Sequence, residues 1–391
     1  MRRAVGILGG VLLWAVVIVC CVIVVVPRFL DHIYYRGPQS SHFDTARFFN
    51  PDGEDTLAPP TGGSRASFFV RYFLQDDDRP IWPTHVPVAP TKPAARIDGQ
   101  RMVVTWIGHA TVLIQTQGLN ILTDPIWSET SGPYGLGPKR VTEPGVRLAD
   151  LPKIDVVLVS HDHYDHMSLP TLRQIWDRDR PLIITSLGND AVMSGIPSVA
   201  RDWGGRVTVR PGIDVIATRN HHWGTRFMAD RNRALWSSFV VTLPGGNLFF
   251  AGDTGFGDGK WPAEARAYGP IRLALLPIGA FRFVPGQMGI ASHVGPVDSA
   301  EVFARLGASR AIAIHWGTFR LSYEARDTPP RLLDAVMKCR TDIDARRTFI
   351  AVTPGAQTEI GSMLADTPGE KPVARPQVLR CLDTPQVRAM R

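Results

Sequence analysis

The chain has 391 residues, and 44% of them are hydrophobic. This length is compatible with two or three domains or with one large α/β domain, and the apolar content is ordinary for a globular protein with a core. The formal net charge of +7 at pH 7 suits anionic partners such as phospholipid headgroups. No basic cluster interleaved with aromatic residues occurs in the sequence, which argues against a nucleic-acid partner.

The N-terminal segment is predicted to be a membrane-spanning helix. Residues 4–26 contain no charged side chain, and a helix of that length crosses the ~30 Å hydrocarbon layer of a bilayer. Arg2 and Arg3 precede this run, which favours a cytoplasmic N-terminus and a periplasmic or otherwise extracytoplasmic location for the rest. A cleaved signal peptide is the alternative, but the run is longer than usual and no small-x-small cleavage site follows. We therefore predict a single-pass membrane anchor over residues 1–27.

The remaining chain divides into three parts by composition. Residues 28–93 are rich in Pro, Gly, Ser and Asp with scattered aromatics, which indicates a connector packed on the domain. Residues 94–365 combine β-rich runs with helical patterns and are predicted to form one α/β domain, whereas residues 366–391 read as an irregular tail. Cys339 and Cys381 form either one disulfide or two free thiols, since spacing alone does not decide between them.

The domain begins with three β-rich runs, at residues 101–107, 110–115 and 119–123, separated by turn residues. They predict a strand meander that ends at Asp124. This carboxylate either orients a metal-binding His or caps the turn before Pro125. Further strands are expected at 156–159, 182–185, 214–218, 237–243, 247–251, 272–277 and 311–314, and helices after Ser168 and at 297–306 and 329–339.

The apolar strand at 156–159 leads into the sequence His161-Asp162-His163-Tyr164-Asp165-His166. Four potential metal ligands lie within these six residues, on the loop that leaves the C-terminal end of a strand, where open α/β folds place their sites. Four ligands are too many for one catalytic zinc that keeps an open position. The motif therefore predicts two metal ions.

Three other predicted strands also end in potential ligands. The strand at 214–218 precedes His221 and His222, the hairpin at 237–251 precedes Asp253, and the strand at 311–314 precedes His315. One His after a strand is more often a buried imidazole with ordinary hydrogen bonds. Because potential ligands recur at several strand ends, we expect them to converge on one shared metal site.

These residues together resemble the motif pattern of the metallo-β-lactamase superfamily. Within it, the chain is similar to the group of phospholipases D that hydrolyse N-acylphosphatidylethanolamine and their RomA-like bacterial relatives, over roughly residues 80–345. The resemblance implies an αβ/βα sandwich, with two β-sheets face to face, helices outside and a dinuclear zinc site along one edge. The runs that carry it are 105–111 (TWIGHAT), 122–125 (LTDP), 161–166 (HDHYDH), 222–223 (HW), 249–255 (FFAGDTG), 276–280 (LPIGA) and 314–319 (IHWGTF).

Carried over residue by residue, the resemblance implies a set of ligands for two zinc ions. His222 is preferred to His221 because it precedes Trp, as in the family pattern. His163 also favours hydrolysis, since the oxygen-reducing di-iron members carry Glu at this position. Ligation by nitrogen and oxygen alone remains compatible with iron or manganese. The implied ligands are His161, His163 and His222 for one zinc, Asp165, His166 and His315 for the other, and Asp253 as the bridge, with Asp165 and Asp253 the catalytic carboxylates.

The function implied by the resemblance is that of a membrane-anchored dinuclear zinc hydrolase. We expect a phosphodiesterase of the phospholipase D type that acts on N-acylphosphatidylethanolamine-like phospholipids through a metal-bound hydroxide. Tyr164 and His293 match substrate-contacting positions, although Tyr164 could simply pack beside the strand and His293 could cap a helix. His109, Asp124 and His221 are expected to support the ligands.

Residues 281–290 depart from the family's Tyr-Glu-Pro-Arg-Trp-Phe run, so the lipid itself is left open. One alternative is a lactonase or carboxyl-ester hydrolase of the same fold. Another is a non-catalytic, metal-stabilised envelope protein, although a binding protein has no need of an open dinuclear site. The expected partners are a phospholipid-like substrate and the membrane, and the sequence is compatible with a homodimer.

Overall fold

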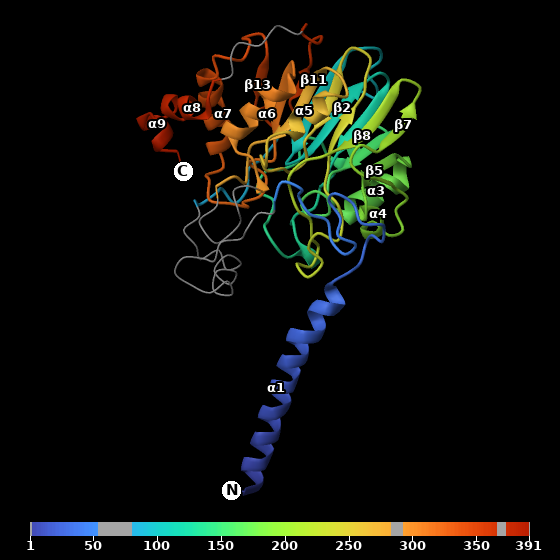
Figure 1. Cartoon of the computed structure of the whole chain (residues 1–391), viewed down its shortest axis with the longest axis vertical. Coiled ribbons are helices and arrows are strands. Elements are labelled where there is room, and N and C mark those ends of the chain that lie inside the picture. The colour runs from blue at the N-terminus through green and yellow to red at the C-terminus, as the bar shows by residue number, and fades with distance from the viewer. Residues whose placement is uncertain (1, 54–79, 283–291, 366–372, 391) are drawn as a thin grey trace.

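The computed structural model describes residues 2–53, 80–282, 292–365 and 373–390. These residues form a domain of two seven-stranded sheets, and one long N-terminal helix projects from it (Figure 1). A shared hydrophobic core joins strands of both sheets, including Val104 and Leu158 from the first and Val215 and Leu273 from the second. The predicted αβ/βα sandwich is confirmed.

The first sheet begins as an antiparallel meander and continues as parallel strands. The first three strands in the chain pair antiparallel with one another, and the third and the next three then pair parallel in sequence order. All four residues of β4 are buried, because the sheet is covered on both faces. In spatial order the strands are β14 (Gln357–Glu359), β1 (Met102–Gly108), β2 (Thr111–Thr116), β3 (Leu119–Thr123), β4 (Val156–Val159), β5 (Leu182–Ser186) and β6 (Val199–Arg201).

The second sheet repeats this plan. Its first four strands in the chain are antiparallel, and the parallel part runs from β10 to the far edge. The predicted hairpin across Pro244-Gly245-Gly246 is present, and Gly245 adopts a positive φ in its turn. In spatial order the strands are β13 (Thr348–Ile350), β12 (Arg310–Ile314), β11 (Ile271–Pro277), β10 (Asn247–Phe250), β9 (Ser238–Val241), β8 (Ile213–Thr218) and β7 (Arg206–Arg210).

Helices cover the outer faces of both sheets. Helix α3 (Leu169–Asp179) packs Leu172 and Ile175 against the first sheet, and Ser168 caps its N-terminus by accepting a hydrogen bond from the Thr171 amide. Helix α6 (Pro296–Leu306) packs against the second sheet and ends at Gly307 in the left-handed conformation, as predicted. The other helices of the domain are α4 (Asn189–Val192), α5 (Trp261–Arg266), α7 (Thr328–Cys339) and two 3-10 turns, η1 (Pro133–Gly135) and η2 (Leu148–Asp150).

Helix α1 (Arg2–Leu30) is long enough and apolar enough to cross a membrane. Its segment Gly6–Leu30 carries exposed apolar side chains and none of its most apolar stretch is buried against the domain. The connector after it packs on the domain where it is described. Phe43 and Phe48 join a cluster with Leu235 and Trp236, while residues 54–79 lie outside the described residues.

The C-terminal segment differs from the predicted irregular tail. Residues 373–390 contain two short helices, α8 (Arg375–Cys381) and α9 (Pro385–Arg388). Val378 and Leu382, four residues apart, lie on one buried face against Leu332 and Val336 of α7. A disulfide joins Cys339 at the end of α7 to Cys381 at the end of α8. The disulfide and the apolar pair hold a polar segment whose composition alone gave no sign of structure.

Reduction of this disulfide should lower stability. The bond closes a loop with a sequence separation of 42 residues, for which the chain-entropy model gives a loss of about 2–4 kcal/mol. We expect Cys381→Ser to lower the melting temperature and to make it insensitive to dithiothreitol, whereas the wild type should shift on reduction. An unchanged melting temperature of the wild type with and without dithiothreitol would contradict the bond.

Candidate metal centre

The candidate ligands lie at one edge of the sandwich, on loops that leave the strands of both sheets. Asp124 follows β3 and residues 161–166 follow β4, in the first sheet. His222, Asp253 and His315 follow β8, β10 and β12, in the second sheet. The sequence placed each ligand after an apolar strand, and the packing of the two sheets brings the strand ends together.

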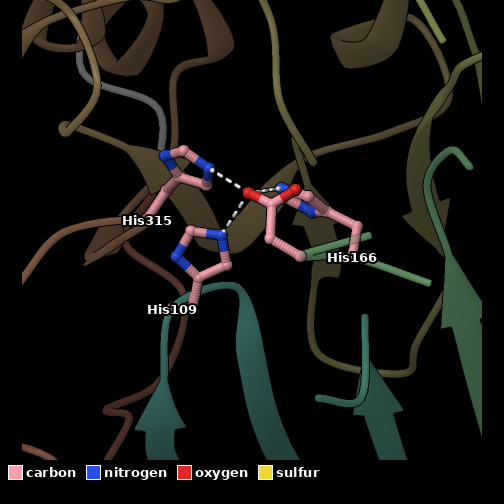
Figure 2. Close-up of side chains that lie close together, drawn as sticks. His109, His166 and His315 are labelled. Atoms are coloured by element: carbon pink, nitrogen blue, oxygen red, sulfur yellow. Dashed lines mark hydrogen bonds and ion pairs between the residues drawn. The ribbon is translucent and has the colours of Figure 1, made fainter. Parts of the chain in front are cut away.

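One group of side chains surrounds a single carboxylate oxygen, Asp165 Oδ2. His109 Nε2 lies 2.8 Å from it, His166 Nε2 3.5 Å and His315 Nε2 3.6 Å. Figure 2 shows the three imidazoles directed at this carboxylate from different parts of the chain. The four residues have the spacing of a metal-binding group. His109 approaches Asp165 most closely, and its hydrogen bond orients that carboxylate.

A second group consists of His161, His163 and His222. The Nε2 atom of His161 lies 2.8 Å from Nδ1 of His163. The ring centroids of His161 and His222 are 4.7 Å apart, and those of His163 and His222 are 5.3 Å apart. The three nitrogen donors therefore converge, as a tetrahedral metal with one remaining open position requires.

Asp253 lies between the two groups. Its Oδ2 atom is 3.0 Å from His166 Nε2 and 3.1 Å from His315 Nε2, and 4.0 Å from Nε2 of His222 in the other group. The preceding Gly252 has φ of 61°, and a Cβ atom there would lie 2.6 Å from the Cβ of Ser160. Glycine is therefore required for the backbone to bring this short carboxylate between the groups.

Hydrogen bonds fix which imidazole nitrogen faces the centre. His222 Nδ1 lies 2.9 Å from the carbonyl oxygen of Ser292, which can only accept, so Nδ1 carries the proton. His166 Nδ1 donates likewise to Asp124 Oδ2, at 2.6 Å. In His222, Nε2 is then left with its lone pair directed at the centre, the arrangement that second partners impose on metal-binding His residues. In His166, Nε2 faces Asp253; burial acts to lower the pKa of this imidazole, but Asp253 and Asp165 raise it well above its usual value, so a metal would replace the Nε2 proton.

Asp124 also reaches the first histidine of the motif. Ser160 donates its amide and its hydroxyl to the two oxygens of Asp124, at 2.7 and 2.6 Å. The Ser160 oxygen is in turn 2.8 Å from His161 Nδ1. One fully buried carboxylate therefore orients a histidine of each group, His166 directly and His161 through Ser160. The structure thus supports the orienting role of Asp124 over that of a turn cap alone.

Some buried polar atoms of the described site residues lack a hydrogen-bond partner and are free to bind metal ions. Within the described residues, Nε2 of His222 and Oδ1 of Asp253 are buried and have no hydrogen-bond partner. Such orphaned atoms are costly unless something binds them. The donors are imidazole nitrogens and carboxylate oxygens, which suit zinc and, as the sequence also allowed, iron or manganese. The residues therefore fit a dinuclear centre.

The electrostatics of the two groups differ. Burial lowers the pKa of His163 to about 3 and holds the pKa of His161 and His222 well below the usual range, so all three imidazoles are neutral donors. Burial also acts to lower the pKa of His315, but Asp253 and Asp165 outweigh it and raise that pKa to about 9. Without metal, the carboxylates therefore draw protons onto facing imidazoles, and a metal cation would take the place of these protons.

The structure places the remaining predicted site residues around this centre. His221 turns away from it, with Nδ1 3.1 Å from Asp52. His293 Nδ1 lies 3.8 Å from Asp253 Oδ2, so this ring borders the centre. Tyr164 lies outside the cluster, with its ring 3.5 Å beneath the guanidinium of Arg226. Ser160 and the Ser292 carbonyl were missed by the sequence analysis; a polar residue directly before the first His was a signal for Ser160, but nothing marked Ser292.

A Beta-lactamase superfamily domain matches residues 119–316, just over half of the chain. The chain belongs to this superfamily. It is 33% identical over 253 residues to N-acyl-phosphatidylethanolamine-hydrolyzing phospholipase D 1 of Caenorhabditis elegans. The matched region covers 60% of this chain and 70% of the relative. An uncharacterised protein of Mycobacterium tuberculosis is 34% identical over 252 residues, with 60% of this chain and 65% of the relative covered. The present chain thus matches about two thirds of the length of these two relatives.

Solved structures agree with the fold. An isothiocyanate hydrolase from Delia radicum gut bacteria superimposes with a TM-score of 0.52 at 18% identity, covering 67% of this chain and 100% of that one. At this identity the likeness concerns the fold alone. Together, the family and its relatives confirm the predicted resemblance and the enzyme class, a metal-dependent hydrolase.

Asp124→Asn should weaken metal binding by about 10–100-fold, the usual effect of removing a partner that orients a ligand. The amide would still fill the space but would no longer hold the His166 and His161 tautomers. Competition with a zinc chelator measures this change. Asp179→Asn is a matched control, because Asp179 is a buried carboxylate that accepts from the Ile154 amide, outside the site. Equal losses in both variants would contradict the orienting role.

Metal binding should release protons and strengthen as pH rises. The folded metal-free protein holds a proton on His315 up to about pH 9, and a metal must displace it. This raised pKa stabilises the metal-free fold fully below about pH 6.5, and that stability is lost as pH rises through about 9. Calorimetry of zinc binding in buffers of different ionisation enthalpy measures the proton release. Melting temperatures of the metal-free protein across this pH range measure the change in stability. A pH-independent zinc affinity between pH 6 and 9 would contradict this account.

Proposed function

We propose that this chain is a membrane-anchored dinuclear zinc phosphodiesterase of the phospholipase D type, with N-acylphosphatidylethanolamine-like phospholipids as substrates. The position of Asp253 between two groups of ligands carries the proposal, because a shared carboxylate suits two adjacent metal ions. The Caenorhabditis elegans relative, and a mitochondrial one of Saccharomyces cerevisiae at 34% identity, are named for hydrolysis of this lipid.

His161, His163 and His222 would hold one metal ion, and Asp165, His166 and His315 the other, with Asp253 shared. Two such ions supply Lewis acidity at the phosphorus and lower the pKa of the attacking water. The chain contributes a rigid, buried frame: the histidines keep their donor nitrogens fixed through Ser292, Asp124 and Ser160. His109 holds Asp165 in the same way. This preorganisation avoids rearrangement as charge develops on the phosphate.

A cavity of about 740 Å³ borders the centre and suits a lipid. His293 lies on its wall as well as 3.8 Å from Asp253, so an occupant of the cavity would reach the metal centre past this ring. Its walls combine apolar surface for acyl chains with polar groups, among them Asp52 and the ion pair between Arg375 and Asp298. The apolar residues include Phe256, Phe281, Val297 and Leu332.

Membrane anchoring is proposed from α1. A helix that is apolar all round needs either a protein core or a bilayer around it, and α1 has no such protein cover in the described residues. The disulfide between Cys339 and Cys381 supports a domain outside the cytoplasm, since such bonds persist in oxidising compartments. Arg2 and Arg3, which precede the apolar run of the helix, support the same orientation.

Full-length protein loaded with zinc should cleave N-acylphosphatidylethanolamine to phosphatidic acid and the N-acylethanolamine. Asp253→Ala should reduce turnover by at least a thousandfold, about 4 kcal/mol in the barrier, because the shared ligand is lost. Asp179→Asn should retain activity. Product analysis by mass spectrometry, with metal content measured on the same samples, provides the test.

The outcomes separate the candidate reactions. Two metal ions per chain with no phosphodiester cleavage would contradict the proposed substrate while leaving the centre intact. Cleavage of lactones or carboxyl esters by the same sample would then favour the alternative hydrolase. Binding of metal with no hydrolysis of any of these substrates would favour the non-catalytic protein.

A further inference from the structure

The chain that leaves α1 is fixed to the domain by a partly buried ionic joint. Arg233 donates through Nε and Nη2 to the two oxygens of Asp31, at 2.8 and 2.7 Å. Arg47 donates to the same carboxylate, at 2.9 Å to each oxygen. Asp31 follows directly on the last residue of α1. Bidentate arginine–carboxylate pairs set both distance and direction, so the end of α1 has a defined place on the domain.

Aromatic contacts reinforce this joint over the next three residues. The Tyr34 hydroxyl donates to Asp230 Oδ2 at 2.9 Å. The ring of His32 lies 5.9 Å from that of Tyr34 and 5.6 Å from that of Phe227. Asp230, Phe227 and Arg233 belong to one loop, residues 223–233, between His222 and β9. The end of the helix is therefore held by the loop that follows a candidate metal ligand.

The same loop touches the metal centre. Trp223 lies against His163, with ring centroids 4.3 Å apart, and the Arg231 guanidinium lies 4.1 Å from the Trp223 ring. Arg226 lies over Tyr164 and donates to the carbonyls of Asp162, within the metal-binding motif, and of Met167, directly after it. One loop therefore links the metal centre to the end of α1, so the helix axis fixes the orientation of the centre.

Exposed apolar side chains gather around this joint. Tyr134 and Tyr164 line a cavity of about 320 Å³ together with His32 and Tyr34, which places the loop of Tyr134 beside the end of α1. In Figure 1 the loops between β3 and β4 and between β8 and β9 lie on the side of the domain from which α1 projects. Single exposed apolar residues are ordinary, but a group at one face marks an interaction surface. Its members are Ile33, 48% exposed, Tyr134, 92%, Leu136, 63%, and Met228, 57%.

The length of α1 determines how close this face lies to the bilayer surface. Its apolar segment Gly6–Leu30 has 25 residues and would extend about 37 Å, enough to cross the ~30 Å hydrocarbon layer. Leu30 then lies at the membrane surface, with Asp31 and the joint in the headgroup region. Arg28, Arg36 and Lys139 are exposed near it and suit anionic headgroups.

We propose that this face docks on the bilayer that holds α1, with Tyr134, Leu136 and Met228 inserted among the lipid headgroups, so that the metal centre draws its substrate directly from the membrane. The inference rests on the proposed membrane anchorage and deepens it. A single helix would leave the domain free to tumble above the bilayer, whereas the Asp31 joint holds one face toward it. The partner is the lipid surface, recognised by aromatic, aliphatic and cationic groups.

Depth-dependent quenching tests this orientation without relying on activity. In a full-length Cys20→Ser, Cys21→Ser background, Leu136→Cys is labelled with an environment-sensitive nitrobenzoxadiazole dye and reconstituted into phosphatidylcholine–phosphatidylglycerol vesicles. We expect a blue-shifted emission that doxyl-labelled lipids quench at least twofold, and the same at Met228→Cys. Ile350→Cys is the matched control: this side chain is 40% exposed on β13, at the end of the domain away from α1 (Figure 1), and should not be quenched.

Breaking the joint provides the second variant. Asp31→Ala should at least halve the quenching at position 136 and raise the KM for vesicle lipid, while the KM for a water-soluble phosphodiester stays the same. Asp214→Ala, which removes the surface partner of Arg206 on β7, should change neither quantity. An equal effect of both variants would overturn the positioning role of Asp31.

Each remaining outcome is decisive. Protein that fails to float with vesicles would defeat the proposed anchorage and the docking together. Protein that floats, but shows no quenching at positions 136 and 228, would overturn the docking alone. A blue shift without lipid quenching would show that a second copy of the chain covers this face, and would overturn it too.

Discussion

The buried carboxylate of Asp124 is the group on which the geometry of the centre depends. It sits at the end of β3 with φ of 30°, fully removed from solvent, and accepts hydrogen bonds from His166 and twice from Ser160. A buried carboxylate without these partners would be strongly destabilising. With them, it orients a histidine in each of the two groups. The same residue therefore ties the first sheet to the chemistry at its edge.

The second sheet supplies what the first cannot. The motif at residues 161–166 offers four candidate ligands from one loop, but the candidates His222, Asp253 and His315 follow three strands of the opposite sheet. The His315 amide donates to the His109 carbonyl at 2.9 Å, which joins the two sheets beside the centre. Asp253 then stands where its oxygen faces both groups. A centre assembled across the sandwich forms only when both sheets have packed, so folding and ligand convergence are coupled.

Much of this arrangement was predictable from the sequence because buried strands have a simple sequence pattern. Strands covered on both faces, such as β4 and β12, appear as short apolar runs, and each was followed by a ligand residue. The edge strands β6, β7, β13 and β14 were missed, since they are short and only partly buried and so do not form continuous apolar runs. The partners of the ligands were missed for another reason. Ser292 meets His222 through a contact 70 residues apart, and Arg233 meets Asp31 across 202 residues, separations that no local signal reveals.

The metal centre is proposed to be dinuclear, with Asp253 shared between the two ions. Crystals of the zinc-loaded protein, with diffraction recorded on both sides of the zinc absorption edge, test it most directly. We expect two anomalous peaks about 3.5–4 Å apart, one beside His161, His163 and His222 and the other beside Asp165, His166 and His315, with the Asp253 carboxylate between them. A single peak, or two peaks with Asp253 bound to neither, would contradict it.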